Sequence, residues 1–219
     1  QAKETKLEEM RTRVRQGLSE AKEIEFLTVG MRQRYRKLDS ESNQGKVDAA
    51  LLMSYQHEMR KLKRSISQAE EEAINRAVQM SSATRCPTYV VHLSTHLGME
   101  RIKQAQSLGQ AVWTETCPQY LLLSDAEMAR VGPLAKIGPP LRAEDGPDRD
   151  ALWRGLEQGH TSIVSSDHSP HPQELKQVGW DNIFVTPDGA SVPFGSPGLE
   201  TIVSLTYSEG VVKRGLPIW

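Results

Sequence analysis

The sequence is poor in cysteine, in aromatic residues and in long apolar runs. Its 219 residues include two cysteines, Cys86 and Cys117, without CxxC spacing. This excludes a disulfide framework and a thiolate zinc site, so we expect a reducing, cytoplasmic setting. No apolar run approaches the roughly 20 residues that span a bilayer, and no basic start followed by an apolar stretch indicates a signal peptide. We therefore expect no membrane partner.

An excess of one charge is also missing. The chain has 27 Lys and Arg against 28 Asp and Glu, a net charge of -1. This balance provides no basic surface for nucleic acid. The sequence also lacks a glycine-rich phosphate loop. We therefore expect neither nucleic acid nor nucleotides as partners.

Residues 1–68 lack proline, contain three glycines and are dense in Lys, Arg, Glu and Gln. Apolar residues recur at helical spacing in two stretches, with a break near residues 40–45. The stretches contain Leu7, Met10, Val14 and Leu18, then Leu51, Leu52, Tyr55, Met59 and Leu62. The narrow apolar stripe predicts a helical hairpin or coiled-coil arm. Its charges suit a solvated face, and we assign no chemistry to it.

Residues 69–219 have a different pattern, in which short β-branched runs alternate with helical segments. The predicted strands are 88–93, 111–115 and 161–166. The predicted helices are 70–82, 99–108, 125–131 and 150–158, the third of them capped by Ser124. This alternation is typical of an α/β fold with a parallel sheet and crossover helices. In barrels of this type the chemistry lies at the carboxyl ends of the strands.

Two side chains follow predicted strands at that position. His92 is a candidate metal ligand, although a core histidine bonded to a carbonyl is the simpler interpretation of that residue alone. Asp167 is a candidate ligand and general base, although taken alone it suits a turn or helix cap. Their convergence on one edge favours the metal interpretation. Two ligands are nevertheless fewer than the three or four of a protein zinc site.

Other residues leave two interpretations open. His96, His168 and His171 are further candidate ligands, but each suits a surface or turn position better. Cys117 could be a nucleophile, yet no base is placed beside it, so a buried structural thiol is favoured. The Gly- and Pro-rich loops 139–142 and 195–198 could present backbone groups to a planar amide, or could be plain turns.

A series of motifs appears in a fixed order over residues 70–219. They are YVVHLST (89–95), ETCPQYL (115–121), KIGPPLR (136–142), SDHSP (166–170), GSPGLET (195–201) and YSEGV (207–211). Together they strongly resemble the hydantoinase, dihydropyrimidinase and allantoinase group of cyclic amidohydrolases, with the dihydroorotases as close cousins. Each motif alone is a weak signal, but the ordered series is specific.

The resemblance implies a TIM-type barrel with two metal ions, usually zinc, that hydrolyses the amide bond of a small cyclic substrate. It implies that His92 is the sixth-strand ligand and that Asp167 is the eighth-strand ligand and general base. A metal-bridging hydroxide would attack the ring carbonyl, and Asp167 would pass its proton to the ring nitrogen. The resemblance also places substrate contacts at Gly138, Phe194 and Gly195, the backbone groups of which would hold the amide edges of the ring. His171 falls where dihydroorotases bind a substrate carboxylate.

The remaining ligands of the family have no counterpart in this sequence. They are a His-x-His on the first strand, a carboxylated lysine on the fourth and a histidine on the fifth; His57 in a helical context replaces none of them. We therefore expect a partial TIM-type barrel, its last three or so units, at residues 69–219, with weak or no activity. A non-catalytic scaffold with a coiled-coil arm is the alternative. Open sheet edges would favour a homo-oligomer.

Overall fold

The structure is a computed structural model, which describes residues 49–180 and 182–217. The chain divides into two compact units, residues 1–73 and 74–219. The helices and the break that we expect within residues 1–48 lie outside the described residues. Helix α2 (Ala49–Thr84) runs through residues 68–69, where we placed the domain boundary. No glycine or proline interrupts these 36 residues, so the helix has no sequence signal to end earlier.

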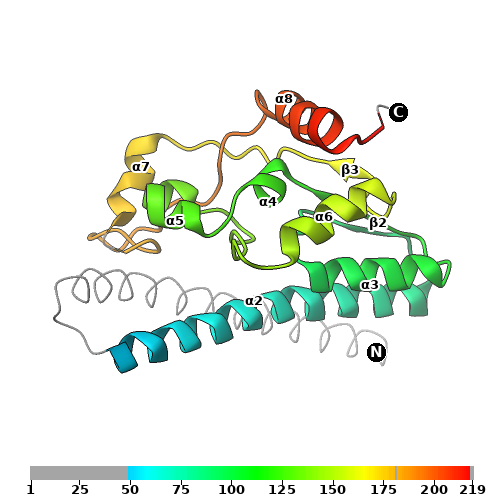
Figure 1. The fold of residues 1–219 in the computed structure, drawn as a ribbon, viewed down its shortest axis with the longest axis horizontal. Coiled ribbons are helices and arrows are strands. Elements are labelled where there is room, and N and C mark those ends of the chain that lie inside the picture. The colour runs from blue at the N-terminus through cyan, green and yellow to red at the C-terminus, as the bar shows by residue number, and fades with distance from the viewer. Residues whose placement is uncertain (1–48, 181, 218–219) are drawn as a thin grey trace, which may run out of the picture. The chain divides into compact units, whose positions relative to one another are not determined.

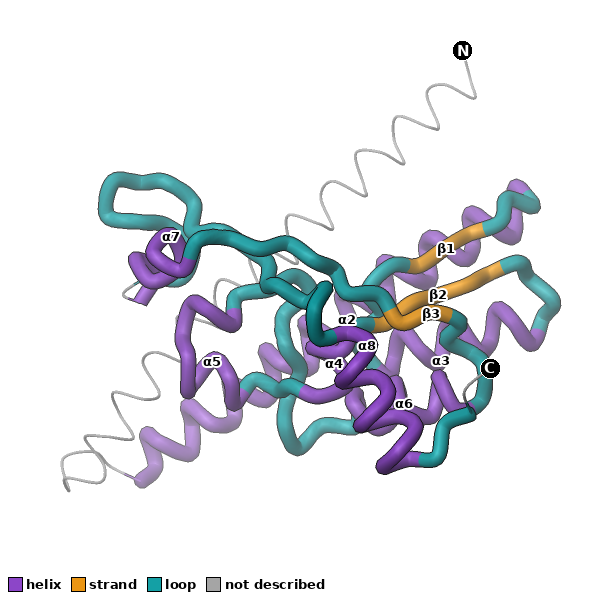
Figure 2. The backbone as a smooth tube through the Cα atoms, turned by 90° about the horizontal axis from the view of Figure 1, so that it is seen from above, coloured by secondary structure: helices purple, strands orange, loops and turns teal. Residues whose placement is uncertain are grey.

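The second unit contains a three-stranded parallel sheet in the order β1-β2-β3 (Figure 2). Its strands are β1 (Thr88–Val90), β2 (Val112–Thr116) and β3 (Ile163–Val164). Helix α3 (His96–Ser107) connects the first two strands, and α6 (Asp148–Glu157) precedes the third. This confirms the predicted α/β class with parallel strands and intervening helices.

The two faces of this sheet differ. Helices α3 and α6 lie on one side of it (Figure 1), and Val112, Thr114 and Thr116 of β2 are buried. On the opposite face Tyr89, Trp113 and Ile163 are exposed. Side chains alternate along a strand, and the register pairs Tyr89 with Trp113, so these residues share one surface. We call the surface formed by Tyr89, Trp113, Glu115 and Ile163 the open face.

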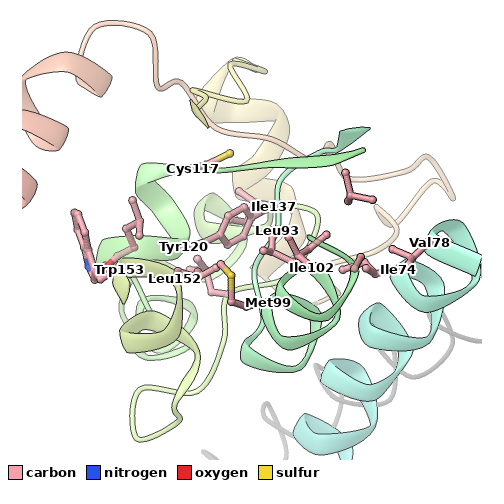
Figure 3. Close-up of a cluster of buried hydrophobic side chains, with 14 residues drawn as sticks. Ile74, Val78, Leu93, Met99, Ile102, Cys117, Tyr120, Ile137, Leu152 and Trp153 are labelled. Atoms are coloured by element: carbon pink, nitrogen blue, oxygen red, sulfur yellow. Dashed lines mark hydrogen bonds between the residues drawn. The ribbon is translucent and has the colours of Figure 1, made fainter. Parts of the chain in front are cut away.

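The hydrophobic core lies beside the sheet, among α3, α6 and the part of α2 that begins at Ile74 (Figure 3). Met99 of α3 and Leu152 of α6 are fully buried. The two helices pack closely, because a Cβ added to Gly155 would come within 2.2 Å of the Met99 Cε. Glycine at position 155 therefore permits the contact that closes the core behind the sheet.

The predicted helices are present with shifted ends. Helix α3 begins three residues before the expected start, where the Thr95 hydroxyl accepts a hydrogen bond from Gly98 N. The N-cap of helix α5 (Ala126–Val131) is Asp125 rather than the expected Ser124, although the Ser124 Oγ accepts a hydrogen bond from Ala126 N at 3.3 Å. Strands β1 and β3 end at Val90 and Val164, before their predicted ends at residues 93 and 166, because the chain turns there.

Several short elements were not predicted. They are α4 (Pro118–Leu122), η1 (Gly132–Ala135), α7 (Gln173–Gln177), η2 (Val178–Trp180), α8 (Ile202–Leu205) and the π-helix η3 (Thr206–Val212). Each covers one or two turns, which is too short for apolar periodicity to identify. Within the described ranges, no helix combines the length and the apolar character needed to cross a membrane.

Candidate functional site

The carboxyl ends of the three strands bring three side chains to one edge of the sheet. His92 lies two residues beyond β1, Cys117 directly follows β2, and Asp167 lies three residues beyond β3. Neighbouring backbone bonds hold both flanking segments to β2: Leu93 N donates to Glu115 O at 2.8 Å, and Ser165 N donates to Thr116 O at 2.9 Å. The two predicted ligands are therefore placed on either side of one strand end.

Both candidate ligands occupy left-handed backbone conformations. The φ angle is +41° at His92 and +46° at Asp167. Such angles are uncommon outside glycine, although Asp and His tolerate them better than most residues. Each residue lies in the segment that leaves its strand, and each side chain is half-buried.

The turn at His92 is held from both faces of β2. On the buried face, the Thr114 hydroxyl donates to Val90 O at 2.9 Å, and the Thr116 hydroxyl donates to Leu93 O at 2.8 Å. On the open face, the Glu115 carboxylate accepts from His92 N at 3.4 Å. These bonds satisfy backbone groups that the end of β1 would otherwise leave without strand partners.

Glu115 is a residue that sequence reasoning missed. Its carboxylate accepts a 2.5 Å hydrogen bond from the Tyr89 hydroxyl on the neighbouring strand. Partial burial raises the pKa of Tyr89, which is 44% exposed, to about 12, together with the hydrogen bond and the negative charge of Glu115. The available signal was strand alternation, which places this carboxylate on the open face among apolar side chains.

Cys117 is buried, as the structural interpretation of this thiol required. The pKa of this thiol is raised to about 12, chiefly by burial and then by the negative charges of Asp167 and Glu115. The protonated thiol is a poor nucleophile.

The three other candidate histidines have different surroundings. His96 contacts the buried Asp148 of α6 through Nδ1 and through its backbone N–H, both at 2.8 Å from Oδ1. The Nδ1 of His168 accepts from Gly198 N and Leu199 N at 3.2 and 3.1 Å. His171 is exposed in the loop between β3 and α7. The contacts of His96 and His168 thus fit structural roles.

Among residues 49–180 and 182–217, no three or more His, Cys, Asp or Glu side chains are grouped so that they could hold a metal ion. His92 and Asp167 are two donors of suitable chemistry, an imidazole and a carboxylate. The described residues alone therefore do not fit a complete metal centre.

The predicted substrate-contacting positions Gly138, Phe194 and Gly195 lie together. Gly195 N donates to Lys136 O at 3.1 Å, and a Cβ added to Gly138 would come within 3.6 Å of the Phe194 Cδ1. Gly195 has φ +113°, and a Cβ there would come within 2.5 Å of Ser169 O. The loop at Gly195 therefore packs against the turn that carries Asp167, and only glycine fits that contact.

A buried arginine connects the first of these loops to the segment after His92. The Arg142 guanidinium donates to the Ser94 hydroxyl from Nε at 3.1 Å and from Nη2 at 2.7 Å. Both residues are buried, which strengthens a hydrogen bond by excluding competing water. The loop 139–142 is thus fixed to the strand end rather than being a free surface turn.

Comparisons with known proteins agree with this arrangement, although no family model matches the chain. The L-hydantoinase of Paenarthrobacter aurescens is 38% identical over 149 residues, which are 68% of this chain and 31% of that protein. The allantoinase of Rubrobacter xylanophilus is 36% identical over the same shares of each chain. The dihydropyrimidinase structure from Brevibacillus agri matches with a TM-score of 0.63 and 32% identity, covering 69% of this chain and 32% of that one. The chain thus spans about a third of the length of these relatives.

Proposed function

We propose a hydrolytic function from one premise: this chain belongs to the cyclic amidohydrolase family, with which 68% of it aligns. The proposed reaction is hydrolysis of a carbon–nitrogen bond in a small cyclic amide of the hydantoin or dihydropyrimidine type. The chain would supply part of that active site and would be weakly active or inactive by itself. The supporting observation is that His92, Asp167 and the loops at Gly138 and Gly195 are joined around one sheet edge.

The proposed architecture is the last three or so units of a TIM-type barrel. Parallel strands in sequence order, with helices on one side, support this assignment. So does the open face, where Tyr89, Trp113 and Ile163 expose apolar surface that a closed barrel would cover.

The proposed roles follow from where the groups lie. Asp167, half-buried at the strand edge, would accept a proton from the attacking water and deliver it to the ring nitrogen. Backbone groups at Gly138 and Phe194 and the carbonyl of Gly195 would pair with the amide edges of the ring, because a fixed loop holds such groups in position; the Gly195 N–H already donates to Lys136 O. His92 would contribute an imidazole to a cation, with zinc as the proposed metal.

The residues that the structure describes do not complete a metal centre. We expect the full chain to contain less than one zinc ion per chain after dialysis, and to hydrolyse hydantoin or dihydrouracil weakly or not at all. His92→Ala and Asp167→Asn should each abolish residual zinc binding in calorimetry, whereas His57→Ala should not. Two tightly bound ions with turnover would contradict the expected inactivity.

The exposed His171 distinguishes a dihydroorotase-type substrate from a hydantoin-type substrate. If the substrate carried a carboxylate, as in a dihydroorotase, His171→Ala would weaken dihydroorotate binding and leave hydantoin binding unchanged. Equal effects on both ligands would argue against that role. The motifs 115–121 and 195–201 favour the hydantoinase side.

A scaffold function is the second candidate, and the apolar open face favours it. Self-association would cover the exposed Trp113 and Ile163, so we expect a homo-oligomer. Sedimentation velocity over a range of concentrations tests this expectation. Trp113→Glu should shift the distribution toward monomer, with the exposed Trp180→Glu as the control. A strictly monomeric chain would contradict the scaffold function.

A further inference from the structure

We infer that Lys176 is a positioning residue for substrate: its buried ammonium ties together the two loops that carry Gly138 and Gly195. This inference rests on the proposed function, because those loops are the proposed binding site for the cyclic amide. It assigns a role to a residue of α7 that lies outside the motifs quoted for the family.

The contacts of this ammonium define the role. Lys176 Nζ donates to Leu134 O and Lys136 O at 3.0 Å each, and to Gly195 O at 2.5 Å. An ammonium has three N–H donors, so these three carbonyls use all of them. Two acceptors lie in the segment leading to Gly138, and the third belongs to Gly195 itself. One side chain thus joins positions about 60 residues apart.

The Lys136 carbonyl accepts two hydrogen bonds. Lys136 O accepts from Lys176 Nζ and also from Gly195 N at 3.1 Å. The Lys136 ammonium in turn donates to Val192 O at 2.6 Å and lies 3.9 Å from the centroid of the Phe194 ring. Both loops are therefore cross-linked on either side of Phe194, which carries one of the proposed substrate contacts.

Burying the Lys176 ammonium costs desolvation free energy unless its hydrogen bonds compensate for the loss of water. It is 4% exposed, and this burial lowers its pKa from the ordinary value. A buried ammonium is tolerated when its donors are satisfied, as they are here. The segment that follows α7 is also closely packed, since a Cβ added to Gly179 would come within 2.9 Å of the Val192 Cγ1 and 3.0 Å of the Pro133 Cβ. An apolar side chain at 176 would therefore leave three carbonyls without this donor in a place that excludes water.

The test uses the full 219-residue chain and hydantoin as the probe. Amide chemical shifts are followed by NMR during a hydantoin titration, and amide hydrogen exchange is measured without ligand. In Lys176→Met, exchange protection of the Gly195 amide should fall about tenfold or more. The Kd for hydantoin should rise by about tenfold, which corresponds to the loss of one buried interaction. Lys176→Arg keeps the donors and should recover part of the affinity.

Lys213→Met is the matched control, because Lys213 is exposed and pairs with Glu209 at 2.7 Å. It should change neither readout. If Lys176→Met does not fold, the unsubstituted chain decides: the Lys176 ammonium should give a slowly exchanging NMR signal with nuclear Overhauser contacts to Gly195. A rapidly exchanging ammonium would overturn the inference.

Two further outcomes separate this inference from the proposed function. Unchanged hydantoin affinity in Lys176→Met, with binding intact in the unsubstituted chain, would overturn the positioning role alone. No saturable shift in the unsubstituted chain would overturn the proposed substrate site and the positioning role together.

Discussion

The Tyr89 hydroxyl donates a 2.5 Å hydrogen bond to the Glu115 carboxylate, across two neighbouring strands on the open face. The other oxygen of that carboxylate accepts the His92 backbone N–H. A tyrosine on β1 therefore influences the turn that carries His92 through a residue of β2. Removing the phenol hydroxyl in Tyr89→Phe should destabilise the fold by about 1 kcal/mol and speed hydrogen exchange at the His92 amide. Unchanged exchange at His92 would argue against this connection.

The ionisation of Tyr89 provides a pH prediction. The folded-state pKa is raised from 10.0 to about 12 by burial and by Glu115. The stability contributed by the neutral phenol is therefore fully present below pH 10.0 and is lost as the pH rises through about 12. Ultraviolet titration of tyrosinate should detect this late ionisation. In Glu115→Gln the pKa should fall but remain above its ordinary value, because burial persists.

The two cysteines should differ sharply in reactivity. Cys86 is exposed, whereas Cys117 is buried with a pKa raised from 9.0 to about 12. Below pH 9.0 a thiol reagent should label only Cys86 in the folded chain, with Cys117 labelled after unfolding. Mass spectrometry of the labelled protein measures this. Asp167→Asn should lower the pKa of Cys117, because after burial the charge of Asp167 contributes most to the raised pKa. An unchanged pKa would contradict the influence of Asp167 on this thiol.

Glycine at 195 should be much harder to replace than glycine at 189. Both have positive φ, +113° and +86°, but only at Gly195 does an added Cβ meet a backbone atom, the Ser169 O at 2.5 Å. Gly189→Ala should cost about 1 kcal/mol from backbone strain alone. Gly195→Ala should cost about 3 kcal/mol, because the clash adds to the strain. Urea unfolding compares them, and equal losses would contradict the close contact.

The core between α3 and α6 should respond to truncation. Leu152 is fully buried, so Leu152→Ala should destabilise the fold by about 2–5 kcal/mol. Leu108 is 70% exposed, and Leu108→Ala should stay within about 0.5 kcal/mol. Thermal unfolding of both variants measures the difference. A similar loss at both positions would mean that α6 is not packed as described.

The sequence predicted the parallel α/β pattern because three β-branched runs and the helices between them have clear periodicity. It also placed His92 and Asp167 at strand ends, where simple counting along the chain is enough. It could not predict the Tyr89–Glu115 bond or the three carbonyls around Lys176, because these join residues distant in sequence. Burial of a lysine is also contrary to its usual surface preference, so no local pattern indicates it.

The left-handed backbone at His92 and Asp167 has a consequence for substitution at these two positions. Glycine would adopt φ +41° or +46° without the steric penalty, which for other residues is on the order of 1 kcal/mol. Glycine at either position would therefore relieve this steric penalty while removing the imidazole or the carboxylate. The cost of the backbone conformation and the role of the side chain can thus be separated at these two positions.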